Sequence, residues 1–304
     1  MDISFLFKGG SIRMQKKKKR LFYSICATLV LAVMLLLTLA GYGIVSAIIK
    51  GNEANSGKLS IGATKIITIP QSDIYSGDLL LLDATHPFNN DASVTLMKTD
   101  RPKTDVGVPI YSVSNTASLS LRADALKQFN AMMEDFYKES KDDNLLVFNA
   151  YDSSKSSQAA IYESGTSLSL GYYTPLGNGE YARNESIYGV ETYAWIYENC
   201  HKYGFTLLES EAEIDDDGEY LGSNVFRYVG VPHATAMAER KLSFEGYLSY
   251  LKENTSASNP MGIMTYAIYY LGAQDSHAVP AKYKYSVSGN NADGFIITVD
   301  LSKN

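Results

Sequence analysis

Few side chains in this chain could bind a metal ion. Its 304 residues include two cysteines and four histidines, which are His86, His201, His233 and His277. A hydrolytic zinc site takes three His, Cys or carboxylate ligands and leaves a fourth position for water. His233 together with Asp215, Asp216 and Asp217 could hold zinc, and the three carboxylates alone could hold calcium weakly. A run of acids followed by Gly218 is more typical of a solvated loop, which is what we expect here.

Nucleophilic chemistry has less support in the sequence. The chain has no G-x-S-x-G motif, and Ser249 to Lys252 has the S-x-x-K spacing without an S-D-N or K-T-G partner. Cys200 lies near the end of a predicted helix with no activating group beside it, so we expect a small buried apolar side chain. The chain also lacks a Gly-rich loop that could hold a phosphate.

The N-terminal segment predicts a membrane anchor. Residues 1–20 hold seven basic residues and one acid, giving +6, and residues 21–49 hold no charged residue. About 20 apolar residues cross a bilayer, whereas a cleaved signal peptide has a shorter apolar core. The basic residues before the span predict a cytoplasmic N-terminus and an extracellular domain from about residue 50. The whole chain carries −6, so the rest carries −12, which argues against nucleic-acid binding.

Two further expectations concern the source and the start of the chain. Cys26 lies in the predicted span and Cys200 beyond it, so the two cannot pair. An outward-facing domain without disulfides is typical of a Gram-positive bacterium. Lys8 to Gly10 can be encoded by a purine-rich ribosome-binding sequence just before Met14, which favours Met14 over Met1 as the initiator.

The remaining segments predict a mixture of helices and strands. Amphipathic spacing predicts a helix over Ser118–Lys141, capped by Ser120. Further helices are predicted over Ser154–Glu163 and over Ser186–Tyr203, the latter ended by Gly204. Residues 83–117 predict loop with one short strand, and Gly165–Gly179 predicts a loop or edge strand. Strands are predicted at Lys65–Pro70, Leu79–Leu82, Leu145–Ala150, Tyr266–Leu271, Tyr283–Val287 and Phe295–Leu301, of which the last two form a hairpin.

Three runs, taken in order, resemble one family of enzymes. They are W-I-Y-E-N-C-H-K-Y-G-F from Trp195, V-F-R-Y-V-G-V-P-H-A from Val225 and S-F-E-G-Y-L-S-Y-L from Ser243. They resemble the last third of the VanY-type D-alanyl-D-alanine carboxypeptidases, zinc peptidases that trim cell-wall stem peptides. The resemblance covers about residues 118–253, with weaker support back to 79. It implies an α+β fold of the hedgehog-type peptidase kind, with a small antiparallel sheet, flanking helices and an added C-terminal β-hairpin.

The resemblance fails at the positions that carry the family's chemistry. The family's first motif, S-x-H-x-x-G-x-x-x-D, matches Thr166 to Pro175 with Gly171 in register, which puts Leu168 and Pro175 at two zinc-ligand positions. The second motif, E-P-W-H-F-R-Y-V-G, puts Val225 at the third ligand and Gly222 at the general base. None of these four residues can bind zinc or act as a general base, so we expect no zinc and no catalytic residue.

The family's substrate-pocket motif, S-G-Y-R with a downstream Gln, is partly kept. It matches Asn149 to Asp152, so an acid replaces the basic residue, and Gln158 stands for the Gln. We expect a groove for a cell-wall peptide or an envelope protein, formed by Tyr151, Ser153, Gln158, Arg227 and His233.

These observations divide the chain into five segments. They are a cytoplasmic segment (1–20), a transmembrane anchor (21–49), a linker and leading strand (50–78), a VanY-like domain (79–255) and a C-terminal strand and hairpin appendage (256–304). The first hypothesis for function is an anchored, extracellular pseudoenzyme that binds without hydrolysing. Two alternatives stay open, which are an active DD-carboxypeptidase with a rearranged metal site and an envelope scaffold unrelated to peptidoglycan.

Overall fold

A computed structural model describes residues 59–89, 93–208, 224–274 and 276–302. No helix within these ranges is long and apolar enough to cross a membrane. The predicted span at 21–49, the Met14 hypothesis, Gly222 and the acidic run Asp215–Asp217 all lie outside the described residues.

The largest sheet has six strands in the order β3-β5-β7-β10-β9, with β8 joined to β7. All its neighbours are antiparallel except β3 and β5. The strands are β3 (Ser112–Val113), β5 (Leu145–Asn149), β7 (Ser167–Gly177), β8 (Glu180–Asn184), β9 (Phe205–Leu207) and β10 (Val225–Tyr228). The expected small antiparallel sheet is therefore a mixed sheet.

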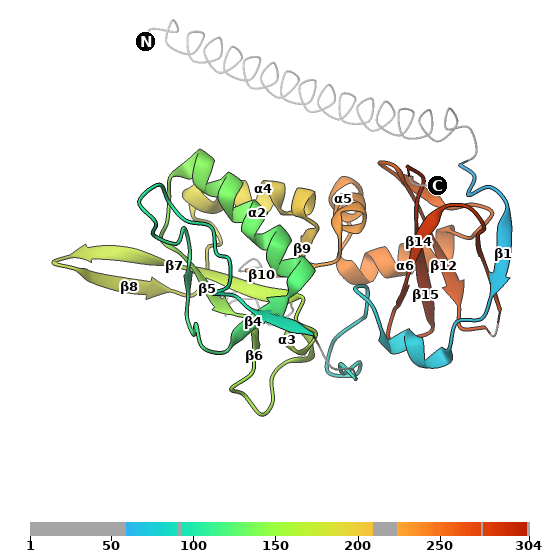
Figure 1. Cartoon of the computed structure of the whole chain (residues 1–304), viewed down its shortest axis with the longest axis horizontal. Coiled ribbons are helices and arrows are strands. Elements are labelled where there is room, and N and C mark those ends of the chain that lie inside the picture. Colours follow the sequence, from blue (N-terminus) through green and yellow to red (C-terminus); the bar gives the residue numbers. More distant parts are fainter. Residues whose placement is uncertain (1–58, 90–92, 209–223, 275, 303–304) are drawn as a thin grey trace, which may run out of the picture. The chain divides into compact units, whose positions relative to one another are not determined.

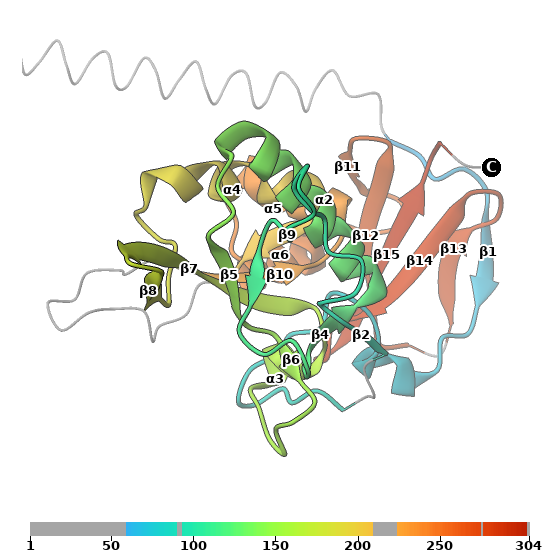
Figure 2. The same cartoon turned by 60° about the vertical axis from the view of Figure 1, so that its left-hand side comes forward.

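Helices cover one face of this sheet (Figure 1, Figure 2). The long helix α2 (Ala123–Ser140) buries the predicted apolar face, including Phe129 and Phe136, against the sheet. Beside it the chain forms α4 (Ala194–Asn199) between two short 3-10 turns, η2 (Glu191–Tyr193) and η3 (Cys200–Tyr203). Gly204 ends this run in the left-handed region, with φ +83°, as its sequence position predicts.

A second sheet forms the C-terminal part of the described chain. Its order is β11-β12-β15-β14, with bounds Met261–Ile263, Tyr266–Gly272, Gly294–Asp300 and Lys284–Gly289. Helices α5 (Val231–Arg240) and α6 (Phe244–Asn254) pack on one face, through Ile268 and Ile296. The other face belongs to a separate apolar cluster that includes Ile69 and Ile74 of the N-terminal part. The predicted hairpin is confirmed as β14 and β15.

The N-terminal part of the domain also contributes to the C-terminal end of the fold. Strand β1 (Thr64–Ile67) pairs with β13 (His277–Pro280), and a 3-10 turn, η1 (Gln71–Tyr75), follows it. The backbone of Leu81 donates to the carbonyl of Asn290. The C-terminal strands are therefore an integral part of the fold, because the chain on both sides of the family-like region builds them.

Several of the predicted elements are wrong in type or extent. Residues 119–122 form β4 (Leu119–Arg122), which joins a small sheet with β2 (Val94–Leu96) and β6 (Tyr151–Asp152), so α2 begins after Arg122 and Ser120 does not cap it. The predicted helix at Ser154–Glu163 is only α3 (Ala160–Glu163). Leu79–Leu82 is largely buried but joins no ladder among the described strands.

The largest error concerns β7, which was expected to be loop or edge strand. Its first half lies between β5 and β10 in the sheet interior. Leu168 and Leu170 point into the core under the helices, and Ser167 and Ser169 alternate to the other face. The alternation Ser-Leu-Ser-Leu is a strand signal that the surrounding Gly and Tyr residues obscure.

Candidate functional site

The candidate site is the face of β7 and β10 opposite the core under α2. Val225 pairs directly with Ser169, and Arg227 pairs with Ser167, so these four side chains share that face. Gly171 shares it too, because alternate residues of a strand point the same way. We call these five residues the open-face set, as they lie on the sheet face without the α2 core.

Leu168 and Pro175 do not belong to one site. Leu168 is fully buried in the core on the opposite face of β7, whereas Pro175 lies in the exposed part of the same strand. Seven residues of strand at roughly 3.3 Å each separate their Cα atoms by about 23 Å. The assignment of these two residues to zinc-ligand positions is therefore wrong in register.

The structure places other residues of β7 on the face of Val225, namely Ser167, Ser169 and Gly171, with Ser169 directly opposite Val225. None of these three residues offers an imidazole or a carboxylate. The structure therefore brings other residues beside Val225 than the sequence alignment does, but neither set of donor atoms fits zinc.

Gly171 is required by the close approach of another strand end. A Cβ atom added there would lie 2.2 Å from the carbonyl oxygen of Asn184. Asn224, beside Val225, reinforces this closure, since its Nδ2 donates to Glu185 O at 2.6 Å and to Leu170 O at 3.1 Å. Backbone and amide groups therefore occupy the space into which any side chain at position 171 would project.

The hydroxyls of Ser167 and Ser169 and the Nε of Arg227 are buried and have no hydrogen-bond partner among the described residues. The guanidinium of Arg227 donates instead through Nη2, to Leu80 O at 2.7 Å and to Asp78 O at 3.3 Å. It also lies over the Phe244 ring, 4.4 Å from the centroid. Burial lowers the pKa of Arg227 to about 10. Arg227 thus ties β10 to the Asp78–Leu80 segment and to α6.

The residues of the predicted groove fall into two groups. Tyr151 and Ser153 follow β5, and Gln158 lies near them, because its Oε1 accepts from the backbone of Asp152 at 3.0 Å. Ser153 is exposed and Tyr151 half-buried. No hydrogen bond, ion pair or ring contact described in the structure joins this group to Arg227 or His233, so a single groove through all five residues stays a prediction.

Asp152 is a buried carboxylate in this group. It accepts from Ser154 N at 2.9 Å and from Ser154 Oγ at 2.6 Å. Burial acts to raise the pKa of Asp152, but these hydrogen bonds and others lower it below its usual value. The position where the family pattern has a basic residue therefore carries a negative charge at neutral pH.

His233 is a structural residue. Its Nδ1 lies 2.8 Å from the hydroxyl of Tyr247 and its Nε2 lies 2.9 Å from Oγ1 of Thr298. Desolvation lowers the pKa of His233 to about 3, so the ring is neutral. It connects α5, α6 and β15 within the fold, and both ring nitrogens are already used, which leaves none for a metal.

The other histidines are dispersed through the fold. His86 closes a turn with Asp83, His277 is buried on β13, and His201 lies in η3. Within the described ranges, no three His, Cys, Asp or Glu side chains come close enough to hold a metal ion.

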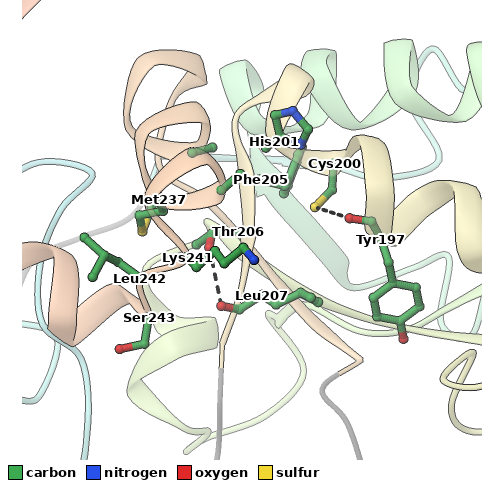
Figure 3. Close-up of a pocket in the computed structure, with 12 residues that line it drawn as sticks. Tyr197, Cys200, His201, Phe205, Thr206, Leu207, Met237, Lys241, Leu242 and Ser243 are labelled. Atoms are coloured by element: carbon green, nitrogen blue, oxygen red, sulfur yellow. Dashed lines mark hydrogen bonds between the residues drawn. The ribbon is translucent and has the colours of Figure 1, made fainter. Parts of the chain in front are cut away.

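A pocket of about 310 Å³ lies between η3, β9 and the turn from α5 to α6 (Figure 3). Aromatic and aliphatic side chains such as Phe205 and Met237 dominate its lining. Cys200 belongs to it, and its Sγ donates to Tyr197 O at 3.7 Å. Burial raises the pKa of the Cys200 thiol to about 12, as expected for a structural cysteine. No carboxylate is among the described residues of the lining, so the pocket favours an apolar group rather than hydrolysis.

Sequence reasoning missed Ser167 and Ser169 of the open-face set, and it used Gly171 only to fix the register of the first motif. The signal for Ser167 and Ser169 is the two-residue alternation of β7, which places both hydroxyls on the face of Val225. The close approach at Gly171 has no sequence signal, because the residue that fills the space comes from β8.

The chain is similar in sequence to a D-alanyl-D-alanine carboxypeptidase of Enterococcus faecium. The two are 27% identical over 243 residues, which covers 76% of this chain and 78% of the relative. No family model matches the chain.

Among solved structures, the chain resembles the vancomycin-resistance D,D-dipeptidase VanXYg in complex with a D-Ala-D-Ala phosphinate analogue. The TM-score is 0.58 at 20% identity, and the match covers 78% of this chain and 99% of the other. This likeness confirms the mixed fold of helices and strands.

Proposed function

The chain is a VanY-like member of the D-alanyl-D-alanine carboxypeptidase family, and from this we propose that it binds peptidoglycan stem peptides without hydrolysing them. The observation that carries the proposal is the composition of the open-face set, Ser167, Ser169, Gly171, Val225 and Arg227. It offers hydroxyls and a guanidinium but neither an imidazole nor a carboxylate.

Zinc hydrolysis needs a metal to activate water and a carboxylate to take the proton. The residues do not fit zinc in either arrangement, since neither the set aligned by sequence (Leu168, Pro175 and Val225) nor the open-face set supplies an imidazole or a carboxylate. An acid introduced at Gly171 would also meet the backbone of Asn184. The loss of catalysis would therefore need several coordinated changes to reverse.

Peptide binding requires fewer chemical groups than hydrolysis does. Hydrogen bonds and shape suffice, and the Tyr151, Ser153 and Gln158 group keeps polar side chains at the surface beside β5. Asp152 adds a negative charge, which would repel a free carboxylate near it. We therefore expect the ligand to present amide or amine groups there, with any carboxylate directed elsewhere.

The location of the protein is part of the proposal. The basic segment 1–20 and the apolar run 21–49 support a single-pass anchor with the peptide-binding domain on the outer side of the cell membrane. Protease added to intact cells should remove the domain from full-length protein. Protection of the domain until the membrane is broken would contradict this placement.

Binding can be tested with the full chain in detergent or nanodiscs. We expect it to co-sediment with isolated Gram-positive cell walls and to bind a soluble pentapeptide ending in D-Ala-D-Ala by calorimetry. If neither the walls nor the peptide are bound, the protein is better explained as an envelope scaffold unrelated to peptidoglycan.

A matched pair of variants locates the groove. Ser153→Tyr places a bulky ring at an exposed position of the predicted groove, whereas Ser156→Tyr makes the same change at an exposed position of the same loop. We expect Ser153→Tyr to weaken peptide binding at least tenfold and Ser156→Tyr to leave it unchanged. Equal effects would place the ligand elsewhere.

A further inference from the structure

The outer part of β7 and all of β8 form a two-stranded arm. The pairing of β7 with β5 ends at Tyr172 opposite Leu145, and its pairing with β10 ends at Ser169. Beyond these points only β8 accompanies β7, and Figure 1 shows the arm projecting from the sheet. Among the described residues β8 has no neighbour on its outer edge. This arm therefore presents a free strand edge, which is a template for pairing with another strand.

One face of the arm carries a row of aromatic and cationic side chains. Tyr173 pairs directly with Arg183, so the two share a face, and Tyr181 joins them two residues along β8. The Arg183 guanidinium lies 4.3 Å from the centroid of the Phe148 ring, and Tyr173 and Tyr181 meet edge to face at 6.3 Å. Tyr181 is 59% exposed. One side of Arg183 and most of Tyr181 thus remain open.

The backbone of β8 has a defined set of outward groups. Tyr173 N donates to Asn144 O, so the backbone groups of Tyr173 point away from β8. Pro175, two residues on, must point the same way. Tyr172 and Thr174 therefore bond to their partners on β8, Asn184 and Ala182. The N–H and C=O groups of Tyr181 and Arg183 must then point outward, along the free edge.

We propose that β8 is a self-association edge, at which two copies of this chain pair antiparallel about a two-fold axis through Ala182. In that register Tyr181 of each copy lies opposite Arg183 of the other. Both outward residues of both strands are then hydrogen-bonded, which gives four backbone hydrogen bonds. A two-fold axis through Arg183 instead would place like charges opposite each other, and one through Tyr181 would pair Arg183 with Gly179 of the turn.

The side chains fit this register. Ala182 meets its copy in a non-hydrogen-bonded pair, where Cα atoms approach to about 4.5 Å and a small side chain is favoured. Arg183 lies between Phe148 of its own chain and Tyr181 of the other, and cations stack favourably on aromatic faces. A five-residue strand makes a small interface, so we expect a weak, concentration-dependent dimer. This inference does not depend on whether the protein binds peptidoglycan.

Cysteine cross-linking of the full chain tests the axis. In a Cys26→Ser background, Ala182→Cys should form an interchain disulfide under mild oxidation, since the two Cα atoms lie within disulfide range. The control is Glu180→Cys, which is on the same strand and more exposed. In the proposed register its two copies lie four residues apart, about 13 Å, which is too far for a disulfide. We expect Ala182→Cys to cross-link at least tenfold faster.

Two outcomes would overturn the proposal. They are a rate for Glu180→Cys equal to or above that for Ala182→Cys, and an Ala182→Cys chain that stays monomeric at every concentration.

A second variant tests the outward hydrogen bonds. Tyr181→Pro removes one outward N–H without touching the bonds to β7, and combined with Ala182→Cys it should abolish cross-linking. The control Tyr181→Val keeps that N–H and should reduce the rate of cross-linking only in part. Cross-linking that persists in the Tyr181→Pro variant would contradict the strand pairing.

Discussion

Val225 lies directly opposite Ser169 in the antiparallel ladder of β10 and β7. In the family pattern the Val225 position belongs to a metal-binding histidine, whereas here an aliphatic side chain faces a buried hydroxyl without a partner among the described residues. A hydroxyl opposite an aliphatic group can donate to a ligand but cannot activate water. The relationship therefore favours binding over hydrolysis.

The close approach at Gly171 predicts a large loss of stability on substitution. Gly171→Ala should lower the free energy of unfolding by about 2–3 kcal/mol, because the new Cβ meets the backbone carbonyl of Asn184. The control is Gly272→Ala, also in a strand, where a Cβ meets only a flexible side chain at 3.8 Å and the change should stay within about 0.5 kcal/mol. Urea unfolding followed by Trp195 fluorescence measures both. Similar losses for the two variants would show that the approach at Gly171 is not tight.

Arg227 should tolerate no conservative change. Arg227→Lys should cost about 2–4 kcal/mol, because a single ammonium cannot both bond the Asp78 and Leu80 carbonyls and lie flat on Phe244. The matched change Arg240→Lys removes an exposed guanidinium from the ring of Tyr250 and should cost under about 1 kcal/mol. Thermal unfolding of the two variants compares them, and an equal shift in Tm would contradict the structural role of Arg227.

His233 predicts a pH dependence of stability. Its folded pKa of about 3 lies below the usual 6.5, so below pH 6.5 the unfolded state binds more protons than the folded state. The free energy of unfolding should therefore fall as the pH drops from 6.5 towards 3, by up to about 1.4 kcal/mol per pH unit, and be constant with respect to this group above 6.5.

The variant His233→Gln isolates this effect. It keeps a polar side chain beside Tyr247 and Thr298 but cannot titrate, so its unfolding free energy should vary less between pH 6 and pH 4.5. His201, whose pKa burial also lowers, is present in both proteins and contributes equally. Parallel pH profiles for the two proteins would exclude His233 as a buried neutral group.

Cys200 should be inert in the folded protein. Because burial raises the pKa of its thiol to about 12, a thiol reagent at pH 8 should label Cys200 only after denaturation. A Cys26→Ser background removes the other thiol. Rapid labelling of the native protein would show that the pocket around Cys200 opens.

Much of the domain follows from local sequence patterns. The apolar face of α2 and the hairpin of β14 and β15 were both predicted, because each is set by periodicity or turn residues within one segment. The left-handed end of the helical run at Gly204 was also predicted, from the glycine itself. These elements depend little on partners far away in the chain.

The errors arise where distant partners decide the structure. Residues 119–122 were included in the predicted helix, yet they form β4 between β2 and β6, in line with the alternation of Leu119 and Leu121 with serines. The early part of β7 has the Ser and Gly content of a loop but lies between β5 and β10. The metal register failed for the same reason, since only the ladder shows that Leu168 faces the core while Val225 and Ser169 face the other way.

The most direct test of the account is an assay of D-alanine release by the full chain. The purified protein, supplied with zinc and a pentapeptide ending in D-Ala-D-Ala, should release no D-alanine above a no-protein control and should bind less than a stoichiometric amount of zinc. Release of D-alanine that a chelator abolishes, together with one zinc ion per chain, would contradict the account and favour an active carboxypeptidase with a rearranged metal site.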